Sequence, residues 1–132
     1  MSSENVEALR RVYAGWERGD FTTSEGLMEK NIVLVVSPGF PTEGLWVGID
    51  GVKKHTAQVL DAWESLTMAA ESYTEAGDTV LVRVHQRGIG AGSGVSTEMR
   101  YFQLWSFRGS KAIRLEVVAD EDEALEAVGL PE

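Results

Sequence analysis

Residues 101–118 read YFQLWSFRGSKAIRLEVV, and this stretch decides the fold class. Apolar and polar side chains alternate on both sides of Gly109, which predicts two antiparallel strands joined by a tight turn. Residues 120–128 follow with the sequence DEDEALEAV, in which Asp120 can cap a short helix. The chain is therefore expected to end in a sheet followed by a short helix.

The segments before this ending extend the same sheet. Residues 66–74 and 79–87 predict two more strands around a turn at 76–78. Valines alternate with charged residues in the second of these strands, so one face of the sheet should be apolar and the other charged. The charged face is expected to carry Arg83, His85, Arg87, Glu98, Arg100, Arg114 and Glu116.

Three helices are expected ahead of this sheet. Apolar residues recur at helical spacing between Val6 and Trp16, a shorter helix is predicted after Asp20, and a third helix is predicted from about Gly51 to Trp63. Residues 32–36 predict a short strand, and residues 37–41, with two prolines, a loop. Helices early and an antiparallel meander late predict an α+β domain in which three N-terminal helices cover the apolar face of a curved sheet.

Composition narrows the function classes. The chain has 132 residues, which predicts a single domain over residues 1–132. The net charge is −9 without any basic stripe, so a nucleic-acid partner is not expected. There is no cysteine and there are only two histidines, so no metal and no cofactor is predicted, with a site of mixed histidine and carboxylate ligands left as the alternative. The sequence shows neither a signal peptide nor an apolar run long enough for the membrane, which predicts a cytoplasmic protein.

Several short motifs together resemble the SnoaL-like group of the nuclear-transport-factor-2-like superfamily, which includes ketosteroid isomerase and polyketide cyclase relatives. These motifs are the Trp-x-x-Gly-Asp sequence at 16–20, Gly48 and Gly51 before the third helix, the glycines of 88–94, the turn at 107–109 and the ending at 114–130. The resemblance implies a cone-shaped barrel with a deep pocket between sheet and helices. It does not fix the reaction, because this fold hosts several kinds of enzyme and also non-catalytic binders.

The catalytic pattern of ketosteroid isomerase is altered in this chain. The resemblance places the base of that enzyme at Ser37-Pro38, its protonated aspartate at Gln103 and its phenol near Val12, one residue from Tyr13. Serine is no base at neutral pH and glutamine does not titrate, so steroid-type isomerisation is not predicted. The remaining candidates for catalysis are His55 as the group that moves a proton, with Tyr13 and Gln103 as the groups that polarise a carbonyl.

An aromatic-rich pocket lining is also expected. Its predicted members are Trp16, Trp46, Trp63, Gln86, Tyr101 and Trp105. For any one aromatic residue plain core packing is an equal alternative, and for His55 the alternative is a position at the rim bonded to a backbone carbonyl. Two functions follow as hypotheses: an acid–base enzyme of isomerase, cyclase or dehydratase type, or a non-catalytic protein that binds a small hydrophobic molecule. A homodimer through the charged sheet face is the expected assembly.

Overall fold

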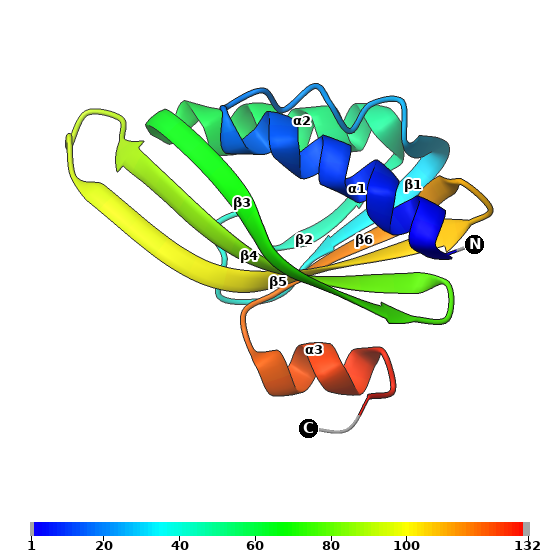
Figure 1. Cartoon of the computed structure of the whole chain (residues 1–132). Coiled ribbons are helices and arrows are strands. Elements are labelled where there is room, and N and C mark those ends of the chain that lie inside the picture. The colour runs from blue at the N-terminus through cyan, green and yellow to red at the C-terminus, as the bar shows by residue number, and fades with distance from the viewer. Residues whose placement is uncertain (1, 131–132) are drawn as a thin grey trace.

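The computed structural model describes residues 2–130, with side chains from residue 4 onward. Its elements are α1 (Ser2–Glu17), β1 (Met28–Val36), β2 (Gly44–Val47), α2 (Gly48–Asp61), β3 (Trp63–Ala76), β4 (Thr79–Gly90), β5 (Ser96–Arg108), β6 (Lys111–Val118) and α3 (Glu121–Ala127). The strands form one six-stranded sheet in the order β2-β1-β6-β5-β4-β3. The β1–β6 pair is parallel and the other pairs are antiparallel, as Figure 1 shows.

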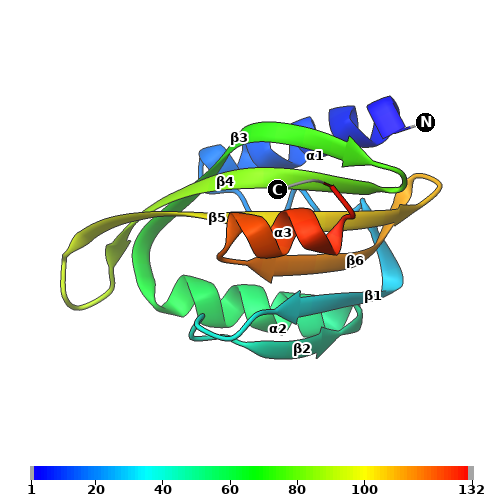
Figure 2. The same ribbon diagram turned by 90° about the horizontal axis from the view of Figure 1, so that it is seen from below.

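The sheet is strongly curved, and α1 and α2 both lie over its concave face (Figure 1), α1 nearer β3 and α2 nearer β1 (Figure 2). The view from below shows α3 on the opposite, convex face, where it lies over β5 and β6 and runs roughly along them (Figure 2). Helices of this length cannot stand alone, so each gains its stability by burying an apolar stripe against the sheet. The α+β class and the curved, mostly antiparallel sheet predicted from the sequence are therefore confirmed.

The core lies between the concave face and the two N-terminal helices. On α1, Leu9 and Tyr13 are almost completely buried, and Trp16 is nearly so. The inward side chains of β4 and β5 alternate as predicted, with Val82 and Trp105 fully buried. The register sets the Cα of Gln103 opposite those of Val82 and Val117, so its polar side chain enters an otherwise apolar layer in the middle of the sheet.

The prediction of three N-terminal helices is wrong: there are two, and the third helix of the described residues is α3 at the C-terminus. Residues 20–27 form consecutive turns instead of a helix. The carboxylate of Asp20 accepts hydrogen bonds from the backbone N and the hydroxyl of Thr22, at 3.1 and 2.6 Å. Such a local bond competes with helical hydrogen bonding, and it holds this segment in a turn. Phe21 and Leu27 still pack against the core.

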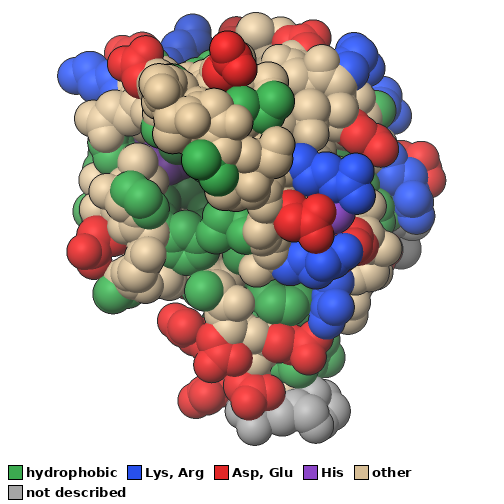
Figure 3. Space-filling view, turned by 90° about the vertical axis from the view of Figure 1, so that its left-hand side faces the viewer, with side chains coloured by type: hydrophobic (Ala, Val, Ile, Leu, Met, Phe, Trp, Pro, Cys, Tyr) green, Lys and Arg blue, Asp and Glu red, His purple; other side chains and the backbone are tan. Residues whose placement is uncertain are grey.

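The convex face is less uniformly charged than predicted. A second apolar cluster lies between α3 and the sheet. Ala124 of α3 packs there against Leu81, Phe102, Leu104 and Val118, and Leu125 and Val128 lie beside them. The N-terminus of α3 is capped as expected, since Asp120 accepts a 3.0 Å hydrogen bond from the backbone N of Asp122. Outside this cluster the face carries ion pairs such as Arg100–Glu71 and Arg114–Glu116. In Figure 3 a group of basic and acidic side chains lies beside a hollow rimmed with hydrophobic side chains.

None of the helices within residues 2–130 combines the length and the apolar character that crossing a membrane requires.

Candidate functional site

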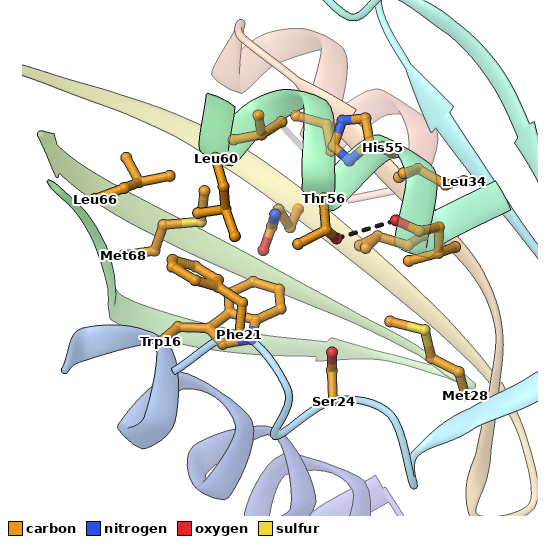
Figure 4. Close-up of a pocket in the computed structure, with 15 residues that line it drawn as sticks. Trp16, Phe21, Ser24, Met28, Leu34, His55, Thr56, Leu60, Leu66 and Met68 are labelled. Atoms are coloured by element: carbon orange, nitrogen blue, oxygen red, sulfur yellow. Dashed lines mark hydrogen bonds between the residues drawn. The ribbon is translucent and has the colours of Figure 1, made fainter. Parts of the chain in front are cut away.

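A cavity of about 60 Å³ lies between the concave face of the sheet, α1, α2 and the turns at 20–27. Figure 4 shows α2 above it with Leu60, Thr56 and His55, and Trp16, Phe21 and Ser24 below it. Eleven of the lining residues are apolar: Trp16, Phe21, Met28, Leu34, Val52, Val59, Leu60, Leu66, Met68, Leu115 and Val117. The other four are Ser24, His55, Thr56 and Gln103. The lining therefore contains no Asp, Glu, Lys or Arg.

A buried chain of hydrogen bonds ends at this cavity. The indole Nε1 of Trp105 donates to the phenol oxygen of Tyr13 at 2.9 Å, and the phenol donates in turn to Oε1 of Gln103. Burial raises the pKa of Tyr13 well above its usual range, so the phenol keeps its proton and acts as a donor. Tyr13 and Trp105 are thus not wall residues themselves, but they hold Gln103, which is one.

This chain fixes the orientation of the Gln103 amide. The phenol has a single proton, which it donates, so the amide atom that faces it must be the acceptor Oε1. The Nε2 group is left without a hydrogen-bond partner among the described residues, although Gln103 is only 5% exposed. A side-chain donor at a cavity wall without a protein partner is free to bond a ligand or water in the cavity. Gln103 therefore presents a hydrogen-bond donor at the cavity.

His55 reaches the cavity from α2 and is supported from behind by the loop before β2. Its Nε2 lies 3.0 Å from the hydroxyl of Thr42. Its ring meets the ring of Trp46 edge to face, with centroids 5.3 Å apart, and Trp46 Nε1 donates to the backbone oxygen of Thr42 at 3.1 Å. Burial lowers the pKa of His55 to about 4. At neutral pH the cavity therefore contains an uncharged imidazole.

The other predicted site residues lie away from the cavity. Trp63 packs over Gly88 of β4, where a side-chain carbon at position 88 would collide with the indole ring. Tyr101 donates a 2.8 Å hydrogen bond to Oε1 of Gln86, so these two buried polar groups satisfy each other. Phe40 covers Tyr101 with its ring edge to face at 5.5 Å. Of the nine predicted residues, Trp16, His55 and Gln103 line the cavity.

Ser24, one of several polar residues between 20 and 27, is a cavity residue that the sequence does not predict. This residue is 4% exposed and lines the cavity opposite Thr56. No periodic pattern marks it, because the segment has no regular structure to create one. Among the described residues, no group of three or more His, Cys, Asp or Glu side chains is close enough to hold a metal ion.

Comparisons with known proteins agree with this architecture. A structure of TerC co-crystallised with polyporic acid is 24% identical and has a TM-score of 0.77, covering 95% of this chain and 98% of that chain. A nuclear-transport-factor-2-like protein from Burkholderia thailandensis is 22% identical, with a TM-score of 0.77 and coverages of 96% and 98%. A Catenulispora acidiphila protein of ketosteroid-isomerase-like fold, in complex with trimethylamine, is 17% identical, with a TM-score of 0.73 and coverages of 95% and 94%.

These likenesses show the fold alone, and no curated protein matches the sequence. The family model of the SnoaL-like domain matches residues 9–115 of the sequence, which is most of the chain. The match begins within α1 and ends within β6, and it includes every cavity-lining residue except Val117. This chain therefore belongs to the SnoaL-like domain family, within the nuclear-transport-factor-2-like fold.

Proposed function

We propose that this protein binds an uncharged, largely apolar small molecule in the cavity between α1, α2 and the sheet. The observation that carries the proposal is the unpaired Nε2 donor of Gln103 in a cavity without ionised side chains. An ionised ligand would lose its hydration there without meeting an opposite charge, which is costly. A carbonyl or hydroxyl oxygen, in contrast, would accept a hydrogen bond from Gln103.

The size of the cavity limits what it holds in this conformation. Its volume of about 60 Å³ is well below the roughly 150 Å³ of an engineered cavity that takes up benzene. The cavity therefore suits a group of a few heavy atoms, and a complete aromatic ring would require its walls to move. That two relatives were crystallised with polyporic acid and with trimethylamine supports a binding role for this fold.

The test uses 2-butanone, which has a carbonyl and only five heavy atoms. Titration followed by NMR should shift the side-chain NH₂ resonances of Gln103 more than those of Gln58, a glutamine on α2 that does not line the cavity. Val59→Phe, which fills the cavity from α2, should remove the binding. Gln58→Phe, one position earlier on the exposed side of the helix, should leave it intact. Equal shifts at both glutamines, or unchanged binding in Val59→Phe, would disprove the proposal.

A second candidate is acid–base chemistry on the bound carbonyl compound, which the position of His55 in the cavity wall favours. Gln103, backed by Tyr13, would stabilise an enolate oxygen while His55 removed the α-proton. The low pKa of His55 makes it a weak base, so simple binding is the function that we place first. Exchange of the α-protons of 2-butanone in D₂O, followed by proton NMR, separates the two. If the protein accelerates this exchange and His55→Asn abolishes the effect, the protein is an enzyme. If the protein does not accelerate the exchange, simple binding is its function.

A further inference from the structure

A second hollow lies directly outside the cavity. It is a groove of about 400 Å³ between residues 19–28 and one side of α2. The groove and the cavity share six wall residues: Phe21, Ser24, Met28, Val52, Thr56 and Leu60. In Figure 4 Ser24 and Thr56 lie on opposite sides of this shared wall, one on the turns and the other on α2. The two hollows are therefore adjacent, and the same six side chains border both.

Ser24 is the polar group at the junction of the two hollows. Its side chain is directed from the turns towards α2 and the cavity (Figure 4). The residue is 4% exposed, and its hydroxyl makes no hydrogen bond with any of the residues that the structure describes. Thr56, across the junction, donates its own proton to the backbone oxygen of Val52 at 3.0 Å and so has only lone pairs left to offer. Ser24 thus holds the unused donor at this point.

The position of Ser24 is fixed by its neighbour. Thr23 donates a 2.8 Å hydrogen bond from its hydroxyl to the backbone oxygen of Val12 on α1, and its side chain fills the space above Gly15. The backbone N of Leu27 donates to the backbone oxygen of Ser24 at 3.1 Å, which closes the next turn. Because the turns are anchored to α1, the Ser24 hydroxyl is held in place before any ligand arrives, and little ordering is needed on binding.

The groove wall differs in chemistry from the cavity wall. Ile49, Ala57 and Leu60 supply an apolar strip along α2, while Asp20, Glu25 and Lys53 add charged groups. A molecule that extends out of the cavity would therefore pass the Ser24 hydroxyl and cover the apolar strip on α2. Its outer end would lie near solvent and near the charged side chains of the groove.

We propose that the groove is the outer half of the binding site and that its ligand is an elongated, oxygenated chain. This inference rests on the proposed function. A narrow end that carries a carbonyl occupies the cavity and bonds Gln103, a second oxygen part-way along the chain accepts a hydrogen bond from Ser24, and the remainder lies in the groove against α2. The small cavity and the larger groove then hold one molecule that neither could enclose alone.

Chain length tests the groove. We expect the affinity for straight-chain 2-alkanones, measured by calorimetry from 2-butanone to 2-decanone, to rise about two- to fourfold for each methylene that the groove covers. Ala57→Trp, which fills the groove from an exposed position that the cavity does not touch, should remove this gain and spare 2-butanone. Gln58→Trp, the neighbouring exposed position outside both hollows, should keep the gain.

The junction is tested with Ser24→Ala, which removes an unpartnered hydroxyl and so costs the fold no internal bond. We expect the affinity for at least one of 4-hydroxy-2-butanone and 5-hydroxy-2-pentanone to fall two- to tenfold more than the affinity for 2-pentanone. If 2-butanone binds but longer chains gain nothing, the groove is not part of the site although the proposed function stands. If Ser24→Ala affects no ketone, the role of Ser24 is disproved. If no ketone binds, both proposals fail.

Discussion

The indole N–H of Trp105 donates a 2.9 Å hydrogen bond to the phenol oxygen of Tyr13 inside the core. The two residues are 92 positions apart in the sequence, one on β5 and the other on α1. Their rings meet nearly at right angles, with centroids 6.5 Å apart. This contact joins the first helix to the centre of the sheet, and through the phenol it positions the amide of Gln103.

Tyr13→Phe is therefore expected to destabilise the protein although the ring is kept. It leaves both Trp105 Nε1 and Gln103 Oε1 buried without a partner, at about 1–3 kcal/mol each. The free energy of unfolding in urea should fall by about 2–6 kcal/mol. Tyr73→Phe is the matched control, because the Tyr73 hydroxyl has no hydrogen bond within the described part of the chain and the residue is half-buried. Equal losses in the two variants would contradict this account.

Gly15→Ala tests how the turns at 20–27 are fixed to α1. In most helices this change stabilises by about 1 kcal/mol, but here the new methyl group would collide with the side chain of Thr23. Overpacking of this kind costs about 1–3 kcal/mol, so we expect a net loss of stability in thermal unfolding. Gly26→Ala, in the same turns but with open space around it, should be neutral or stabilising. The pair Gly15→Ala and Thr23→Ala together should recover part of the loss.

The strands could be predicted because their signal is local. Alternation of apolar and polar residues around Gly109 determines which side chains of β5 and β6 face the core, and the structure follows it through Gln103 and Trp105. A helix after Asp20 is predicted because Asp20 is a typical N-cap residue and Phe21, Leu27 and Met28 could face inward from such a helix. The hydrogen bonds from Thr22 to Asp20 decide against the helix, and such a local side-chain bond leaves no trace in hydrophobic periodicity.

The site was harder to predict because it depends on contacts between distant segments. The identity of Gln103 as a buried amide could be recognised, since its neighbours on β5 are apolar. Its fixed orientation could not, because it is set by Tyr13 from another element. Trp63 and Tyr101 are aromatic residues as prominent in the sequence as Trp16, yet the course of the chain directs them elsewhere. Ser24 enters the wall through irregular turns.

The homodimer remains a prediction, and the structure restricts where it could form. Since α3 covers the apolar part of the convex face, the interface would lie on its charged part. There Arg100 pairs with Glu71 at 3.0 Å, and Arg87 lies 3.7 Å from Glu98. We expect Arg87→Glu to shift the mass in solution towards the monomer, measured by light scattering after gel filtration. Lys54→Glu makes the same change of charge on α2 and should leave the mass unchanged. A parent protein that is itself monomeric would disprove the interface.

His55 should make the stability depend on pH in a defined window. The folded protein holds its pKa at about 4, below the usual value of 6.5, because burial disfavours the charged ring. Between these two values the unfolded chain binds a proton that the folded chain does not, so stability is full above pH 6.5 and falls as the pH drops towards 4. After allowance for partial exposure of the ring, the loss is of order 1–2 kcal/mol. His55→Asn should flatten this part of the unfolding profile in urea, whereas His85→Asn should retain it. A profile that His55→Asn leaves unchanged would mean that the ring is solvated and charged at mildly acidic pH. The conclusion that the cavity wall is uncharged would then be wrong.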